Sequence, residues 1–185
     1  PPPAPLRLAV TAAEGEVTVL RGGVRTRAAA GDELRPEDAL ETAPGARVAL
    51  AGGSYEVTLE EGGRFDVEEI TQELSRFRLA AGLVSARVQE EPGRAVEIQA
   101  ANDAVARTRG GELAVARSGD VVAVGVQRGS AEFRSAGATV SLRPGEQSVA
   151  ARGKAPSAPA AIPASLLRKV SWPAERATNQ RRIVV

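Results

Sequence analysis

The sequence predicts an all-β fold, either an irregular β-barrel or a β-solenoid of many short strands joined by glycine and proline turns. Three observations support this prediction. Apolar and polar residues alternate along most of the chain, which is typical of strands with one buried face. The 19 glycines and 12 prolines fall between these segments at short intervals and mark turns. Aromatic residues make up only 3% of the chain, so the core must be built from smaller aliphatic side chains.

The first half of the chain predicts a series of hairpins. Residues 16–21 and 24–27 alternate on both sides of Gly22-Gly23, a pair that is typical of a tight hairpin turn. Pro44-Gly45 is a second strong turn signal. The other strands expected in this half are residues 6–10, 47–50, 55–59 and 64–67.

One short helix is expected at residues 66–74. There Val67, Ile70 and Leu74 recur at helical spacing. Because the segment lacks a good capping residue, we expect one or two turns rather than a long helix.

The second half repeats the pattern of short strands and turns. Ala81-Gly82 and Arg128-Gly129-Ser130 are expected to be turns between strands. The strands expected here are residues 77–80, 83–88, 95–99, 104–107, 112–116, 121–126, 131–134, 138–142 and 146–150.

The domain organisation follows from composition. Residues 1–5 form a proline-rich leader and residues 6–153 a single β domain. Residues 154–165 are rich in proline, alanine and serine, and we expect a linker, because proline cannot donate to a sheet ladder. Residues 166–185 are expected to begin a further β unit that is too short to fold alone.

Composition excludes several function classes. The net charge is +1 with both signs interspersed, so we expect no nucleic-acid partner. The chain has no cysteine and no histidine, which removes the usual nucleophiles and their bases, and we expect neither an enzyme nor a metal or other cofactor. Adjacent residues of a strand point to opposite faces, so neighbouring glutamates should not form an acid/base pair. These neighbours are Glu60-Glu61, Glu68-Glu69 and Glu90-Glu91.

An ordered series of motifs resembles the FecR domain family. The motifs are Gly31-Asp32-Glu33-Leu34, Leu40-Glu41-Thr42, Gly53-Ser54-Tyr55-Glu56-Val57-Thr58-Leu59, Leu79-Ala80-Ala81-Gly82 and Val140-Ser141-Leu142-Arg143-Pro144-Gly145-Glu146-Gln147. The resemblance covers residues 15–151. The chain departs from the family pattern at Gly111, where the family has threonine, and at Leu113, where it has phenylalanine. The smaller Leu113 predicts a differently packed centre.

The resemblance implies a bacterial cell-envelope module with a protein partner. Our first expectation is a non-catalytic unit that binds a protein or scaffolds a larger periplasmic or surface assembly. A periplasmic signal-transducing regulator of the siderophore-receptor and sigma-factor type is the second expectation, and peptidoglycan or polysaccharide binding is the third. The proline-rich start also fits a chain anchored to lipid through a removed N-terminal region. No apolar run reaches the roughly 18 residues of a membrane helix.

Three residues are candidates for a partner contact. Trp172 is the only tryptophan, and aromatic anchors dominate protein interfaces. The alternative is a place in the core of the second, incomplete β unit. Arg107 and Arg109 are two residues apart, so they should share one strand face and could engage an acidic partner. A solvated face is the alternative for both arginines, and the oligomeric state is left open.

Overall fold

The computed structural model describes residues 6–100 and 103–162, and this part of the chain is all-β, without a helix. The all-β prediction is confirmed. Fifteen strands pair into one large sheet. The strands are β1 (Leu8–Glu14), β2 (Val17–Arg21), β3 (Val24–Arg27), β4 (Glu33–Leu34), β5 (Ala39–Thr42), β6 (Arg47–Gly52), β7 (Tyr55–Leu59), β8 (Arg64–Ile70), β9 (Leu74–Val88), β10 (Ala95–Ala100), β11 (Val105–Ser118), β12 (Val121–Ser135), β13 (Ala138–Leu142), β14 (Glu146–Ala151) and β15 (Ala160–Ala161).

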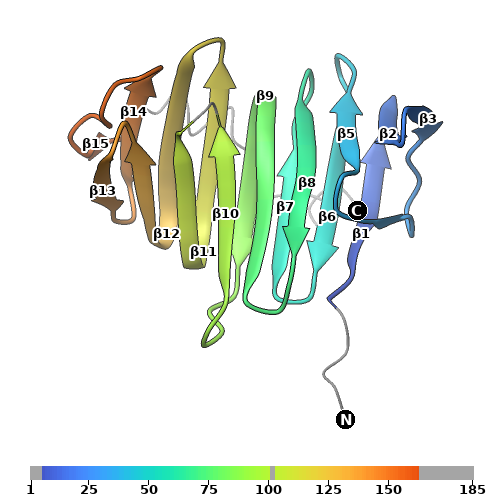
Figure 1. Ribbon diagram of the computed structural model, residues 1–185, viewed down its shortest axis with the longest axis horizontal. Helices are drawn as coiled ribbons and strands as arrows, with labels where there is room; N and C mark the ends of the chain where they lie inside the picture. The colour runs from blue at the N-terminus through green and yellow to red at the C-terminus, as the bar shows by residue number, and fades with distance from the viewer. Residues whose placement is uncertain (1–5, 101–102, 163–185) are drawn as a thin grey trace, which may run out of the picture.

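The sheet is folded over on itself into two layers and does not close into a barrel. Layer A contains the strand order β3-β2-β5-β8-β9-β10-β11-β12-β13. Layer B contains the order β4-β1-β6-β7-β9-β11-β12-β14-β15. In Figure 1 the chain advances along the long axis of the molecule, from the blue N-terminal strands to the orange C-terminal strands.

The three long strands β9, β11 and β12 belong to both layers. The first half of β9 pairs with β8 and runs parallel to β10, whereas its second half pairs with β7 and β11. Strand β12 likewise pairs with β14 through its first half and with β13 through its second half. Each long strand therefore carries the chain from one layer into the other.

Glycines bend the long strands where they change layer. Gly111 has φ +140° and Gly129 has φ +69°, and the two are directly paired between β11 and β12. A Cβ on Gly129 would overlap the carbonyl oxygen of Gly110, and one on Gly111 would overlap that of Arg128. Only glycine fits at this close backbone approach, which explains why Gly111 occupies a position where threonine is expected.

The turns predicted at Ala81-Gly82 and Arg128-Gly129-Ser130 are therefore wrong. β9 and β12 run through these positions without a break. A glycine between two apolar segments predicts a chain reversal, but here it marks a bend within a continuous strand.

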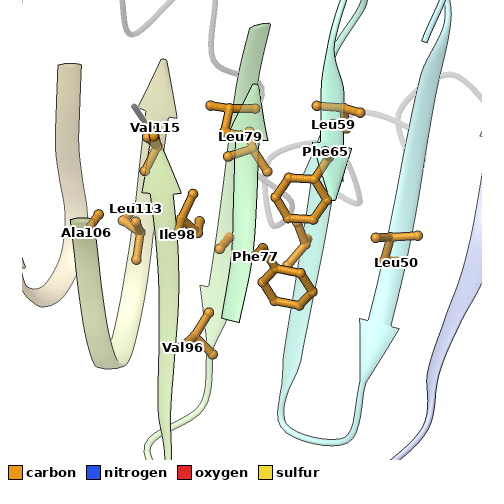
Figure 2. Close-up of a cluster of buried hydrophobic side chains, with 14 of the residues drawn as sticks. Leu50, Leu59, Phe65, Phe77, Leu79, Val96, Ile98, Ala106, Leu113 and Val115 are labelled. Atoms are coloured by element: carbon orange, nitrogen blue, oxygen red, sulfur yellow. The ribbon is translucent and has the colours of Figure 1, made fainter. Parts of the chain in front are cut away.

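The hydrophobic core fills the space between the two layers. Phe77 of layer A stacks on Phe65 at 4.9 Å between ring centroids and meets Tyr55 of layer B edge-on at 5.9 Å. Apart from these rings and Phe133 the core is aliphatic, as the composition predicts, and Leu113 is buried within it. Figure 2 shows side chains of both layers meeting in this cluster.

The helix predicted at residues 66–74 is wrong, because this segment forms the end of β8, a turn and the start of β9. Phe65 and Val67 alternate into the core, as strand residues do. The turn is held by Thr71, whose hydroxyl accepts a hydrogen bond from the Leu74 amide at 3.0 Å and donates to its carbonyl at 3.1 Å. A bulge after Val67 shifts the alternation by one residue, which produced the apparent helical spacing.

Residues 154–162 run along the free edge of β14. The Ser157 amide donates to the Val149 carbonyl at 2.9 Å, and β15 pairs with β14 farther along. This stretch, which we expected to be a linker, adds a short strand to layer B. The leader and the predicted β unit at residues 166–185 lie outside the described residues.

Candidate functional site

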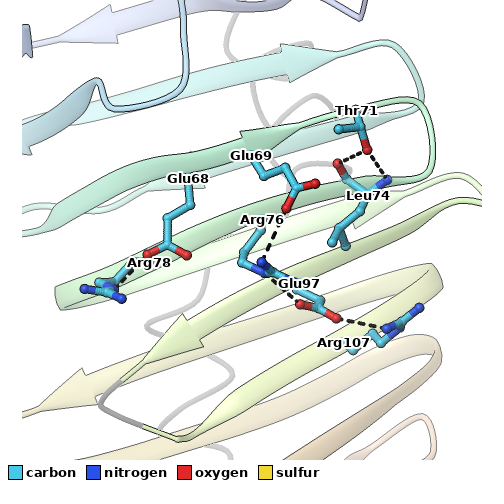
Figure 3. A network of polar contacts seen from close by, with 8 residues as sticks. All are labelled: Glu68, Glu69, Thr71, Leu74, Arg76, Arg78, Glu97 and Arg107. Atoms are coloured by element: carbon cyan, nitrogen blue, oxygen red, sulfur yellow. Dashed lines mark hydrogen bonds and ion pairs between the residues drawn. The ribbon is translucent and has the colours of Figure 1, made fainter.

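The outer face of layer A carries a row of alternating charges. Glu69, Arg76, Glu97 and Arg107 lie side by side on β8, β9, β10 and β11. The Glu97 carboxylate forms ion pairs with the guanidinium groups of Arg76, at 3.1 Å, and Arg107, at 2.9 Å. The Arg76 guanidinium also pairs with the Glu69 carboxylate at 3.3 Å. Figure 3 shows this row on four neighbouring strands. Each charge thus has a partner of opposite sign on an adjacent strand.

Glu68 and Glu69 contact two arginines that share one face of β9. Glu68 pairs with Arg78 at 3.0 Å, and Glu69 pairs with Arg76. The bulge in β8 sets both carboxylates on the outer face, so the expectation that these neighbours face opposite sides is wrong here. Their arginine partners make them structural ion pairs.

Beyond Arg107 the outer face of layer A is hollowed into an open depression of about 500 Å³. It extends over β10, β11, β12 and β13. Its charged lining residues are Glu97, Arg107, Arg109, Glu132 and Arg134. Among the described residues, Arg109, Glu132 and Arg134 have no ion-pair partner. The depression therefore presents two available guanidinium groups and one available carboxylate.

The predicted partner-contact residues are placed as follows. Arg107 and Arg109 line the same depression, so they share one face of β11. Arg107 is held by Glu97, whereas Arg109 is exposed. Trp172 lies outside the described residues. Whether any of the three contacts a partner remains a prediction.

Sequence reasoning missed Arg134 and Glu132 as members of this site. Both alternate with Phe133 in β12, which is buried, so the local pattern already indicated that they face outward. Their place beside Arg107 depends on the pairing of Glu132 with Arg107 across β11 and β12. That register is set after the bend at Gly129, and no local sequence pattern specifies it.

The groups with shifted pKa values are Asp38, Arg21 and Tyr55, which lie outside the depression and contribute to the fold. Burial alone would raise the pKa of the Asp38 carboxyl, but hydrogen bonds from the Arg21 guanidinium and the Arg35 amide outweigh burial and lower it. The same pairing with Asp38 raises the pKa of Arg21. Arg21 also donates to the Glu33 carbonyl at 3.0 Å and so joins β2 of layer A to β4 of layer B. Burial raises the pKa of Tyr55 in the core.

Within residues 6–100 and 103–162, no three carboxylates gather in a way that could hold a metal ion. The same part of the chain contains no helix with the length and apolar character needed to cross a membrane. The depression offers a polar surface of arginine, glutamate, serine and threonine side chains on four paired strands. Its chemistry suits recognition of an oppositely charged surface.

The fold is similar to that of two solved bacterial structures. Two crystal structures from Parabacteroides distasonis, each described as a "putative anti-sigma factor", superpose with TM-scores of 0.53 and 0.58 at 18% and 15% sequence identity. They cover 62% and 70% of this chain, which in turn spans 54% and 62% of theirs. At such identities the likeness shows the fold alone.

No curated protein matches the chain. The family model described as "FecR protein" matches residues 38–132, which include the core strands β5 to β11 and most of β12. This match covers half of the chain and agrees with the motif series described above. The chain therefore belongs to the FecR family.

Proposed function

We propose that this chain is a non-catalytic signalling module of the cell envelope that binds a protein partner in the periplasm or at the cell surface. Membership of the FecR family and the likeness to structures described as anti-sigma factors support this proposal. The observation that carries it is the open depression on layer A, where Arg109, Glu132 and Arg134 project from a rigid sheet without ion partners among the described residues.

The charges of the depression define the partner's chemistry. Arginine binds carboxylates through two parallel hydrogen bonds, so Arg109 and Arg134 together fit a protein segment with acidic side chains. The Glu132 carboxylate fits a cationic side chain of the same partner. Because neighbouring strands fix the backbone of these residues, little ordering is needed on binding, and specificity comes from matching charges.

A scaffolding role in a larger envelope assembly is the second candidate. The ion-paired row of layer A and the continuous sheet would suit a spacer that holds other modules apart. Signalling comes first, since the structural likeness is to proteins described as regulators. Binding of peptidoglycan or another glycan is the weakest candidate, because the depression is lined without an aromatic side chain on which a sugar ring could stack.

The proposal is tested by capture of partners from native envelope extracts with the parent chain and with Arg109→Glu and Arg134→Glu. We expect a captured protein whose affinity falls about tenfold with each reversal, as for charged interface contacts, and falls further with added salt. Arg27→Glu is the matched control, since Arg27 is an exposed arginine on β3 of the same layer. Equal capture by all variants would contradict a role for the depression.

A second arm separates the candidate functions. If the module signals, Arg109→Glu in the cell should change transcription of a defined set of genes while the envelope assembly stays intact. If it scaffolds, the assembly should be lost without a specific transcriptional change. Retention on purified peptidoglycan that survives both arginine reversals would instead favour glycan binding elsewhere on the chain.

A further inference from the structure

The outer face of layer B contains a row of small residues that is buried although it points away from the core. Thr58, Ser85, Ala114 and Gly125 are direct neighbours on β7, β9, β11 and β12. Thr58, Ser85 and Ala114 are 4%, 1% and 6% exposed, yet none belongs to the core cluster between the layers. A sheet face in water would leave such residues exposed, so this small-residue row requires a cover.

Polar atoms along this face also require partners. The side-chain oxygens Ser85 Oγ and Gln127 Oε1 are buried without a hydrogen-bond partner among the described residues. Glu112 Oε1 also accepts no hydrogen bond there, but it forms an ion pair with Arg87 at 3.6 Å. Ser85 stands in the row itself, and Glu112 and Gln127 flank it on β11 and β12. A buried acceptor left unpaired is destabilising, so Ser85 Oγ and Gln127 Oε1 on one face indicate that the cover brings hydrogen-bond donors.

The described chain already begins to cover this row. After pairing with β14, the backbone reaches Ile162, whose amide donates to the Gly145 carbonyl at 3.0 Å. The Ile162 side chain lies 3.3 Å from the position that a Cβ on Gly125 would occupy, on the outer side of β12. The next residues of the sequence therefore start at one end of the small-residue row.

We propose that residues 163–172 of this chain bind across the outer face of layer B and cover the small-residue row. The row from β12 to β7 spans three strand spacings, or about 14 Å, which about five extended residues can cross. The segment contains Leu166, Leu167, Val170 and Trp172, whose apolar side chains fit against small residues. In this proposal, backbone amides of the segment are the donors for Ser85 Oγ and Gln127 Oε1.

The single tryptophan makes this proposal measurable in the full chain. We expect Trp172 fluorescence to be blue-shifted relative to the urea-unfolded chain and poorly quenched by acrylamide. Thr58→Arg puts a long charged side chain into the row and should shift the emission to the red and raise quenching severalfold. Thr26→Arg, on the exposed strand β3, is the matched control and should change neither. Far-UV circular dichroism checks that each variant folds.

A second variant keeps the test valid if Thr58→Arg fails to fold. Leu166→Asp combined with Leu167→Asp alters only the proposed cover, and should expose Trp172 to the same degree. Emission of the parent chain that equals that of the unfolded chain would overturn the proposal. Protection that appears only with increasing concentration, together with a dimer in light scattering, would also overturn it, since the cover would then come from a second copy.

Discussion

The outer faces of the two layers differ in a way that the shared strands make easy to compare. On layer A, β9 and β11 present Arg76 and Arg107, which are paired with Glu97 and partly open to solvent. On layer B the same strands present Ser85 and Ala114, which are small and buried. One strand thus carries a solvated, laterally paired face in one half and a covered face in the other.

This difference shows that the outward-facing side chains of a sheet indicate whether that face is exposed to solvent. Where water is the neighbour, long charged side chains satisfy one another along the row, and their aliphatic stems shield the sheet. Where another segment covers the face, small side chains leave room for it, and polar atoms such as Ser85 Oγ remain without partners in the sheet. The size of the outward residues and their hydrogen bonding are therefore informative together.

The largest effect is expected where the two faces are joined, at the bend of β12. Gly129→Ala should lower the free energy of unfolding by about 2–5 kcal/mol, since it adds a left-handed strain of about 1–2 kcal/mol and a backbone overlap of about 1–3 kcal/mol. Gly119→Ala is the control, because Gly119 has a similar φ of +58° but open space around it. Urea unfolding compares the two, and equal losses would contradict the account of the bend.

A smaller loss is expected in the centre of the paired row of layer A. Glu97→Ala leaves Arg76 and Arg107 without their shared carboxylate and should cost about 1–2 kcal/mol, because both arginines stay partly hydrated. Glu132→Ala on the same face has no ion pair to lose and should change stability by less than about 0.5 kcal/mol. Chemical denaturation of both variants at neutral pH gives the comparison.

Acid should weaken the ion pair between Asp38 and Arg21, the same arginine that joins the two layers through the Glu33 carbonyl. The pKa of Asp38 is lowered in the folded state, so its contribution is present above the unfolded pKa of about 4 and is lost as pH falls through the folded value. Asp38→Asn should therefore be less stable than the parent at neutral pH, and the gap should shrink below about pH 4. A gap that stays constant from pH 7 to pH 3 would contradict this assignment.

The smallest effect is expected at an exposed ion pair on layer A. Glu68→Gln removes an ion pair with Arg78, whose side chain is 51% exposed, and should change the free energy of unfolding by less than about 0.5 kcal/mol. A loss comparable with that of Glu97→Ala would mean that exposed pairs and central pairs of this face contribute equally.

Much of the fold could be predicted from local patterns. The hairpin predicted around Gly22-Gly23 is present as β2 and β3. Alternation of apolar and polar residues located most strands, because successive side chains of a half-buried strand point to opposite faces. Folding into two layers could not be predicted, since a glycine at a bend, such as Gly82 in β9, looks like a glycine at a turn. The bulge after Val67 concealed a strand for a similar reason.

Only part of the candidate site could be predicted from the sequence. Arg107 and Arg109 share a face because they are two residues apart in one strand, and this local rule held. Arg134 joins them through pairing across the bend at Gly129, which depends on long-range register. The small-residue row is likewise spread over four strands, so no single stretch of sequence displays it.

Selective thiol labelling tests the contrast between the two faces most directly, because the chain has no cysteine of its own. Ser85→Cys places a thiol in the small-residue row, and Ser141→Cys places one on the exposed β13 of layer A. We predict that Cys-reactive reagent modifies the Ser141→Cys chain at the rate of a free thiol and the Ser85→Cys chain far more slowly, with protection lost when Leu166 and Leu167 are both changed to Asp. Equal rates at the two positions in the folded chain would contradict the account.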